Sequence, residues 1–385
     1  MIKESVLDKY VITPDYESVE RREIDDATYF GSEYKEYISN SRLKLINPDE
    51  GGSFETFLKG LQSSNSSSFD LGTAVHEIIL QEDLFEISNQ LKPTAKAGQM
   101  IDKIFYYRNK QDENGRYLYK IGESIIYASE DVNYYVKQLT KDRIKALMKV
   151  GWDYYKYLMN MKFFKPKKEQ IVLDKSTRPA ALACIESIRR NQDAMDLLRP
   201  DAFNFMNNDI INRNEDAIIM KVNVTFPDSL TNPDAKTVSQ DLALKVKIDN
   251  WNINLDDKTI VLNDLKTTRN PTYMFPGSTR NETGEHLDGS FQHYHYYRQM
   301  GFYIWILHQY IKKEFQINLN DFTTNVNMIV VCTSSNYNYK SEVFRVTNEW
   351  IEKGFKEFER LLKYAAYALY NRDSILKSVG YELWD

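Results

Sequence analysis

Two short apolar runs separated by a polar turn constrain this chain more than any other feature. From 242 to 248 every second residue is apolar, which is the period-two pattern of a strand with one buried face. The segment 254–258, Asn-Leu-Asp-Asp-Lys, supplies turn chemistry, and a second strand pattern covers 259–266. The sequence therefore predicts a β-hairpin over 241–268.

Three ionisable residues lie on this hairpin. Asp249 follows the first run, and Asp264 and Lys266 are two apart on the second strand, so their side chains share a face. The hairpin would bring Asp249 close to Asp264, with Lys266 beside both. Two carboxylates and a lysine on one sheet face can hold a hard divalent cation and activate a water. The alternative is an ordinary hairpin with charged ends, because an Asp-x-Lys triplet is common.

Composition excludes several classes of protein. The chain has 385 residues, 42% hydrophobic and 27% charged, which is typical of one large or two ordinary soluble domains. Its net charge of −5 gives no global attraction to nucleic acid, so DNA binding would need a local basic patch or bound metal ions. The two cysteines, Cys184 and Cys332, are too few for a disulfide framework, a four-cysteine zinc site or an iron–sulfur cluster.

No apolar core marks the first 17 residues as a secretory signal. The longest apolar run, 302–307, is far too short to span a bilayer. We therefore expect a cytoplasmic protein without a membrane partner, located in the host cytoplasm if it is phage-encoded.

A helical pattern follows a serine-rich segment. Apolar residues recur at helical spacing over 69–80, with Asp70 as a candidate cap, and Gly72 and His76 share one face. The small Gly72 leaves room for a group to approach His76, although a histidine on an ordinary packed helix fits the same pattern. Further helices are predicted over 97–110, 131–161 with a break near Gly151, 177–198, and 37–43 with Ser39 or Ser41 as its N-cap.

A basic segment stands out in this acidic chain. Residues 137–168 contain ten Lys or Arg and two acids, Asp142 and Asp153. Aromatic residues are interleaved with them: Trp152, Tyr154, Tyr155, Tyr157, Phe163 and Phe164. This alternation suits a surface that tracks a phosphate backbone, and a solvated helix face with its aromatic residues in the core is the equal alternative.

The last third of the chain predicts a helix over 290–315, in which Tyr296, Gln299 and Tyr303 line one face. An irregular loop rich in Pro and Gly covers 269–289, where a substrate-contacting loop or a plain connection would fit. Strand patterns cover 217–224, 323–332 and 340–346, and a closing amphipathic helix covers 348–370.

Taken together, these segments resemble the PD-(D/E)XK nuclease superfamily, in particular its RecB/RecE-like branch of phage recombination exonucleases. The matching residues, in order, are Gly72-Thr73-Ala74-Val75-His76, Asp249, Asp264-Leu265-Lys266, Gln299 and Tyr303. The resemblance covers about 39–310. It departs from the common pattern at Ile248, where a proline often precedes the first acid.

The resemblance implies an α/β (α+β) fold, a restriction-endonuclease-like central mixed sheet flanked by helices. It implies a single nuclease domain over 61–385 with a large helical insertion at about 90–200, and an N-terminal extension over 1–60 packed on the core. The implied ligands of Mg²⁺ or Mn²⁺ are His76, Asp249, Asp264 and the backbone carbonyl of Leu265.

Roles for the remaining residues also follow from the resemblance. Lys266 would orient or deprotonate the attacking water, or stabilise the charged phosphorane. Gln299 and Tyr303 would position the DNA or the lysine. The expected activity is a metal-dependent DNA exonuclease, a hydrolase acting at duplex ends in phage-type recombination or DNA processing. A homo-oligomer and a single-strand annealing protein as partner are family-level expectations.

Two alternatives remain at this stage. One is an endonuclease or single-strand nuclease of the same fold, and the other is a catalytically inactive DNA-binding or scaffold module. Other catalytic classes fit poorly, because the sequence has no G-x-S-x-G elbow and no P-loop. His293 and His295 are two apart, so on a helix they would not share a metal.

Overall fold

The computed structural model describes residues 2–60, 67–133, 140–200, 210–269 and 289–378. Their contacts divide the chain into two compact units. The sheet unit comprises Met1–Ser64, Asn191–Val330 and Glu342–Asp385, and the helical unit comprises Asn65–Arg190 and Val331–Ser341. The domain boundaries expected from the sequence, 1–60 and 61–385 with an insertion at about 90–200, stay predictions.

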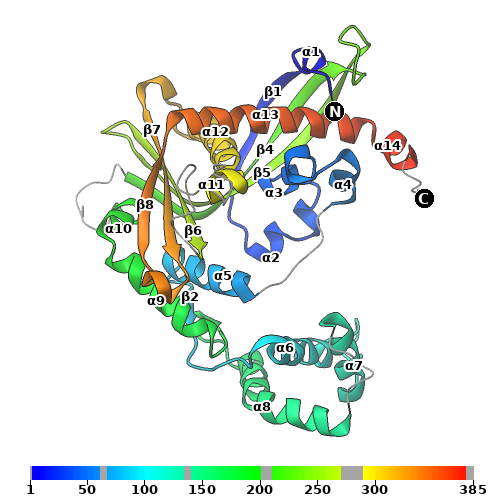
Figure 1. Cartoon of the computed structure of the whole chain (residues 1–385), viewed down its shortest axis with the longest axis vertical. Helices are drawn as coiled ribbons and strands as arrows, with labels where there is room; N and C mark the ends of the chain where they lie inside the picture. Colours follow the sequence, from blue (N-terminus) through cyan, green and yellow to red (C-terminus); the bar gives the residue numbers. More distant parts are fainter. Residues whose placement is uncertain (1, 61–66, 134–139, 201–209, 270–288, 379–385) are drawn as a thin grey trace, which may run out of the picture. The chain divides into compact units, whose positions relative to one another are not determined.

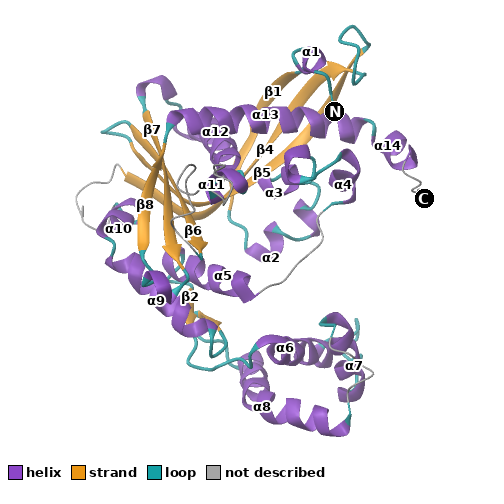
Figure 2. Cartoon of the chain, viewed as in Figure 1, coloured by secondary structure: helices purple, strands orange, loops and turns teal. Residues whose placement is uncertain are grey.

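A six-stranded sheet forms the centre of the sheet unit, in the order β1-β4-β5-β6-β7-β8 (Figure 2). The strands are β1 (Val11–Arg22), β4 (Ile210–Pro227), β5 (Thr237–Asn254), β6 (Thr259–Thr268), β7 (Thr323–Cys332) and β8 (Ser341–Val346). Strand β1 pairs antiparallel with β4, β4 with β5, and β5 with β6. The Thr323 amide bonds to the Lys258 carbonyl and Asn327 bonds to Asn263 further along, so β7 runs parallel to β6. The expected mixed sheet flanked by helices is confirmed.

Two long helices pack on each other and on the sheet, α12 (Tyr296–Phe315) and α13 (Asn348–Tyr370) (Figure 1). Glycine permits their close approach: a Cβ on Gly354 would lie 1.9 Å from the Tyr297 carbonyl oxygen. The Phe302 and Phe358 rings stack beside this crossing with centroids 4.4 Å apart. Because α12 contacts β1, β4 and β5, this packing fixes the helix over one sheet face.

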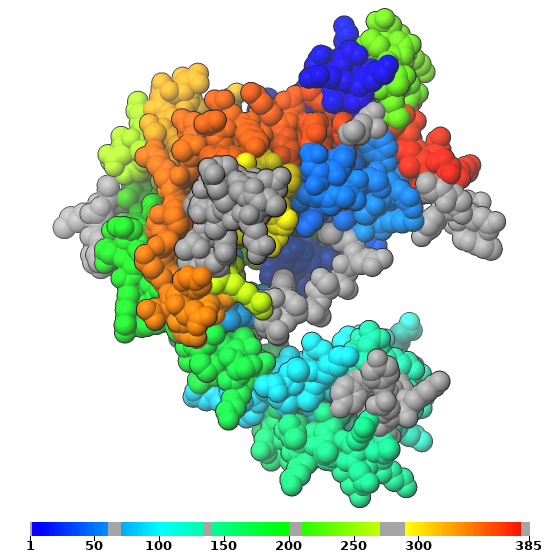
Figure 3. All heavy atoms as spheres, viewed as in Figure 1, coloured from blue at the N-terminus to red at the C-terminus, as the bar shows by residue number. Residues whose placement is uncertain are grey.

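N-terminal elements also belong to the sheet unit. They are α1 (Glu4–Leu7), α2 (Asp26–Tyr29), α3 (Asn40–Lys44) and α4 (Phe54–Lys59), with short 3₁₀ turns at Ser32–Tyr34 and Pro48–Glu50. On the face drawn in Figure 3, α3 and α4 lie beside α13, which both contact. Ser39 caps α3 by accepting the Arg42 N–H, as the sequence predicts. The remaining helices of this unit are α10 (Gln192–Leu198), α11 (Ser290–His293) and α14 (Arg372–Ser378), with a 3₁₀ turn at Leu319–Asp321. The 3₁₀ turn Ser335–Tyr337 belongs to the helical unit.

The helical unit contains α5 (Ser67–Leu80), α6 (Ala95–Asn109), α7 (Ile121–Asp131), α8 (Lys141–Phe163) and α9 (Thr177–Arg190), together with the short parallel strands β2 (Phe85–Ile87) and β3 (Glu169–Ile171). Helix α5 packs on α9. Helices α6, α7 and α8 enclose a small apolar core of their own, built from residues such as Met100, Ile104 and Leu147.

Several predicted boundaries are wrong, for local reasons. Helix α8 continues through Gly151 instead of breaking there, because the missing Cβ would lie 2.4 Å from Ile101 and the glycine lets α6 approach. Asp70 lies inside α5, which begins at Ser67. The predicted helix over 177–198 divides at Asn191, whose side chain caps α10.

The helix predicted over 290–315 divides at His295, which has a φ of 51°. The other predicted helices and strands are present, with β4 and β5 longer than their apolar patterns. Of the predicted loop over 269–289, residues 270–288 lie outside the described part of the chain. None of the helices in the described ranges combines the length and apolar character needed to cross a bilayer.

Candidate metal centre

A row of three carboxylate residues crosses three neighbouring strands. Asn214 pairs with Asn250 and Asp216 with Ile248, so the register places Glu215 of β4 opposite Asp249 of β5. Asn250 pairs with Asn263 in the same antiparallel way, and this register places Asp249 opposite Asp264 of β6. One carboxylate oxygen of Glu215 lies within 4.8 Å of one of Asp249. The predicted proximity of Asp249 and Asp264 therefore follows from strand pairing.

Hydrogen bonds and an ion pair fix the two aspartates. Asp249 Oδ2 accepts the backbone N–H of Leu265 at 2.7 Å, which ties β5 to β6 at the centre. Asp264 is 1% exposed; its Oδ2 lies 2.6 Å from Lys266 Nζ, and its Oδ1 accepts from Gln299 Nε2 at 2.8 Å. Asp264, Lys266 and Gln299 thus form one connected group. The sequence predicted Asp264 beside Lys266, whereas the expected contact of Gln299 was with the DNA or the lysine.

Helix α12 covers this group with aromatic side chains. Lys266 Nζ lies 5.4 Å from the centroid of the Tyr296 ring, in a cation–π geometry. Tyr303 follows Gln299 by one turn; burial raises its pKa well above the usual value, and the charges of Asp249 and Asp264 raise it further. A hydrogen bond with Gln299 lowers the pKa of Tyr303, but by less than burial and the two charges raise it. Tyr303 therefore stays protonated and can donate a hydrogen bond.

Lys266 keeps its charge in this surrounding. Burial disfavours the ammonium form, but the neighbouring carboxylates of Asp264 and Asp249 outweigh burial, and the pKa of Lys266 is raised above its usual value. The side chain is therefore a fixed positive charge beside two acids. Such a charge suits the stabilisation of an anion better than proton abstraction.

Glu215 was not identified from the sequence. The apolar pattern of its strand begins only at Ala217, and the pairing that places Glu215 opposite Asp249 joins segments more than 30 residues apart. Its backbone has a φ of 50°, which is uncommon for a residue with a side chain. Glu215 also forms an ion pair with Lys247 at 2.5 Å, and Lys247 in turn pairs with Asp26 of α2.

A ladder of asparagines, with Asn250, Asn263 and Asn327 buried and Asn214 exposed at its end, lies one residue away from the carboxylate row. Asn263 Nδ2 donates to Asn250 Oδ1 at 2.7 Å, Asn250 Nδ2 donates to Asn214 Oδ1 at 2.7 Å, and Asn327 Nδ2 donates to Asn263 Oδ1 at 2.9 Å. Amide side chains bonded across four strands allow one register only, because a slip would leave buried polar groups without partners. The ladder therefore keeps the carboxylate row aligned. No sequence pattern marked it.

His76 and the Leu265 carbonyl complete the set of expected ligands. His76 is half-buried on α5 of the helical unit, at the position the sequence predicted within that helix. Leu265 lies between Asp264 and Lys266 on β6 with its side chain buried. The metal-binding roles of both residues stay predictions.

The donor set fits a hard divalent cation. Asp264 is buried and its Oδ2 contacts the Lys266 ammonium at 2.6 Å, and a carboxylate oxygen has a second lone pair with which it can bind a cation. Glu215, Asp249 and Asp264 together offer the oxygen ligands that Mg²⁺ and Mn²⁺ prefer.

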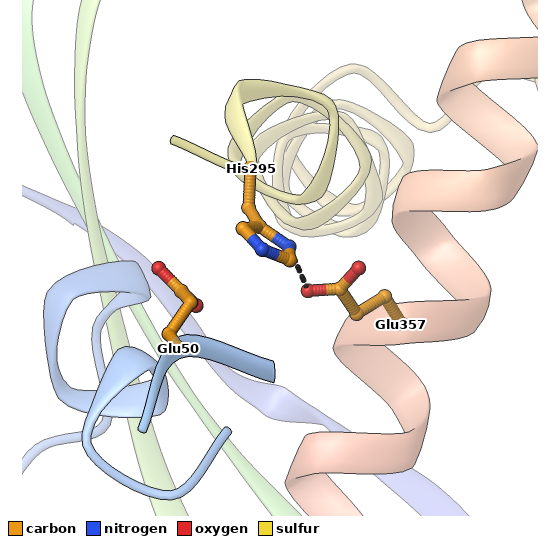
Figure 4. Close-up of side chains that lie close together, drawn as sticks. All are labelled: Glu50, His295 and Glu357. Atoms are coloured by element: carbon orange, nitrogen blue, oxygen red, sulfur yellow. Dashed lines mark hydrogen bonds and ion pairs between the residues drawn. The ribbon is translucent and has the colours of Figure 1, made fainter. Parts of the chain in front are cut away.

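A second cluster joins the start of α12 to α13 and the N-terminal segment. Figure 4 shows the His295 imidazole directed at Glu357, with Glu50 opposite; His295 Nδ1 lies 2.7 Å from Glu357 Oε1. One ligand atom from each residue lies within 4.8 Å of the others, which resembles a metal site. The Arg298 guanidinium, however, bonds both Glu50 and Glu357. One cationic side chain thus bridges the two acids and occupies the position between them, and the cluster is structural.

Comparisons with known proteins add little to this geometry. No protein-family model matches the chain, and no curated protein matches it. Among solved structures, the chain is similar to a protein from Eubacterium rectale named "Putative exonuclease", with 13% sequence identity and a TM-score of 0.42, over 89% of this chain and 87% of that chain. A likeness at this level carries no argument about the activity of the chain.

Proposed function

We propose that this protein is a metal-dependent nuclease that hydrolyses phosphodiester bonds of DNA. The observation that carries the proposal is the carboxylate row Glu215, Asp249 and Asp264 with the Lys266 ammonium 2.6 Å from Asp264. An inactive scaffold has no chemical need to group a buried Asp264 with two half-buried acids and a half-buried lysine, because burying charges opposes folding.

The acids would hold the metal. Asp249, Asp264 and Glu215 would supply oxygen ligands for Mg²⁺ or Mn²⁺, with the Leu265 carbonyl and His76 as further candidates. When bound, the ion polarises a phosphate and lowers the pKa of a coordinated water.

The other side chains position the substrate and stabilise charge. Attack of water on a phosphodiester places extra negative charge on the phosphoryl oxygens, and the Lys266 ammonium is a compact positive charge for that anion. Gln299 holds Asp264 in place through its 2.8 Å hydrogen bond. The protonated hydroxyl of Tyr303 is a donor for a phosphate oxygen or a water.

The proposed substrate is double-stranded DNA attacked from its ends, as in recombination or DNA processing. The basic segment over 137–168 is the proposed contact for the DNA backbone. A homo-oligomer and a single-strand annealing partner accompany this proposal as family-level hypotheses.

The test is incubation with end-labelled linear duplex and closed circular duplex in Mg²⁺, Mn²⁺ or EDTA. Loss of linear DNA alone, abolished by EDTA, is the expected result. Nicking of circles would make the protein an endonuclease, and no metal-dependent loss of either DNA would overturn the nuclease proposal.

Lys266→Ala should abolish cleavage and leave DNA binding nearly intact. A matched control is Lys221→Ala, which removes an exposed lysine from strand β4 and should leave cleavage unchanged. Cleavage retained by Lys266→Ala would contradict the role given to this lysine.

A further inference from the structure

One face of helix α8 carries alternating basic and aromatic side chains. It lies within the basic segment over 137–168 that is proposed above to contact the DNA backbone, so the inference below rests on that proposal and makes it more specific. Lys145, Lys149, Trp152, Lys156 and Phe163 follow one another at spacings of four, three, four and seven residues. At 3.6 residues per turn these spacings place all five on one side of the helix. The face extends over about 27 Å at 1.5 Å per residue.

All five side chains are exposed. Trp152 is 49% and Phe163 78% exposed, although aromatic rings of this size usually bury their surface. The opposite side of α8 carries the residues that pack in the core of the helical unit, including Leu147 and Tyr154. The Trp152 ring stacks on Tyr155 with centroids 6.0 Å apart, but about half of the Trp152 surface and most of the Phe163 surface stay exposed.

A second segment extends this face at its C-terminal end. Tyr117 lies between two cations, with Arg108 5.3 Å and Lys162 5.2 Å from its ring centroid. Lys162 also lies 6.0 Å from the Phe163 ring and donates to Asn109 Oδ1 at 2.9 Å. Tyr117 is 51% exposed, so a third exposed ring stands near Phe163.

The segment 95–168, which includes α8, is positively charged, whereas the chain as a whole is negatively charged. Residues 95–168 contain 16 Lys or Arg and 8 Asp or Glu, a difference of +8 by 16 − 8 in a chain of net charge −5. Lys156 pairs with Asp153 at 2.9 Å, but both side chains are more than half exposed. The ion pair is therefore weak, and a phosphate can replace Asp153 as the partner of Lys156. The face therefore attracts a polyanion.

Exposed aromatic rings among lysines fit a single-stranded nucleic acid better than a duplex. Unpaired bases stack on aromatic side chains and phosphates pair with the cations between them, whereas a duplex keeps its bases stacked inside and offers only its backbone. We infer that the face formed by Lys145, Lys149, Trp152, Lys156 and Phe163 binds single-stranded DNA. The choice of DNA over RNA rests on the proposed nuclease function.

Binding is measured with the full chain in EDTA, so that no cleavage is required. Fluorescence anisotropy follows a labelled oligothymidine of about 16 nucleotides, which is within the site sizes of single-strand binders, alongside a duplex of the same length and an oligouridine. Trp152→Ala with Phe163→Ala should weaken oligothymidine binding by about tenfold or more, while binding of the duplex changes by less than about twofold.

Two further variants separate stacking from charge. Trp152→Leu with Phe163→Leu keeps apolar bulk but removes the flat rings, and should show the same loss. Replacing Lys145, Lys149 and Lys156 by Gln should reduce the slope of log affinity against log salt by about 2, at about 0.7 for each lost phosphate contact on a single strand. The aromatic variants should leave that slope unchanged.

Tyr337→Ala is the matched control, because Tyr337 is an exposed aromatic residue of the same unit, 39% exposed, on the 3₁₀ turn Ser335–Tyr337 and not on α8. Unchanged oligothymidine binding in both aromatic variants would overturn the inference, and so would an equal loss for the duplex. Tighter binding of oligouridine than of oligothymidine would reject DNA as the ligand. Failure of cleavage with intact single-strand binding would reject only the nuclease proposal.

Discussion

Gln299 Nε2 donates a hydrogen bond to Asp264 Oδ1 at 2.8 Å, which joins the first turn of α12 to strand β6. The neighbouring Arg298, 1% exposed, is held by Glu50 and Glu357. The helix start is therefore fixed by one buried ionic cluster, and the next residue along the chain orients a carboxylate of the candidate metal centre. The two clusters are thus connected through consecutive residues of one helix.

Gln299→Ala should weaken Mg²⁺ or Mn²⁺ binding and lower cleavage by about tenfold to a hundredfold, because partners that orient a ligating carboxylate have effects of this size. Metal affinity is measured by titration calorimetry and cleavage on linear duplex. Gln309→Ala, later on the same helix, is the control and should change neither. Wild-type metal affinity in Gln299→Ala would show that the hydrogen bond does not orient a ligand.

Glu215→Gln should weaken metal binding by about tenfold or more, since affinity for a hard cation depends on the number of charged ligands. The variant keeps the shape of the side chain but removes its charge. Calorimetry with Mn²⁺ provides the measurement, and Glu20→Gln on strand β1, half-exposed, is the control. If Glu215→Gln binds Mn²⁺ as the wild type does, Glu215 serves only the ion pair with Lys247.

The sequence predicted those parts of the centre that depend on local pattern. Alternating apolar residues and a polar turn identified the hairpin, and the two-residue spacing of Asp264 and Lys266 placed them on one face. Strand pairing then brought Asp249 to Asp264, as expected. These features need only neighbouring residues, which is why the pattern sufficed.

The sequence did not predict the features that depend on pairing between strands far apart in the chain. Glu215 joins the row through the register of β4 on β5, and the asparagine ladder joins four strands. Neither has a local signature. The division of the helix at His295 has a different cause, because the residue adopts a φ of 51° while its side chain bonds Glu357 on another helix. Tertiary contacts outweighed helical propensity there.

Asn263→Ala should destabilise the protein by about 1–3 kcal/mol, because it leaves buried polar atoms of Asn250 and Asn327 without their partner. The measurement is urea unfolding followed by circular dichroism. Asn223→Ala on strand β4 removes an exposed hydrogen bond to Asp241 of strand β5 and should change stability by less than about 0.5 kcal/mol. A loss in Asn263→Ala no larger than in this control would mean that the ladder does not hold the register.

Acid should destabilise the cluster around Glu357. Burial favours the neutral acid, but hydrogen bonds from His295 and Tyr297 and the charge of Arg298 outweigh it and lower the pKa of Glu357 from 4.5 to about 2. A carboxyl whose pKa is lower in the folded state stabilises the fold above its unfolded pKa, and that contribution disappears as the pH falls from about 4.5 towards 2.

The shift corresponds to roughly 3 kcal/mol at neutral pH. We therefore expect the free energy of unfolding to fall over this range in the wild type, and to fall less steeply in Glu357→Gln, which has no carboxyl to titrate. Urea unfolding at a series of pH values gives both slopes. Glu352→Gln, exposed on the same helix, should keep the wild-type slope. Equal slopes in wild type and Glu357→Gln would mean that the ionised Glu357 does not contribute to holding α12 against α13.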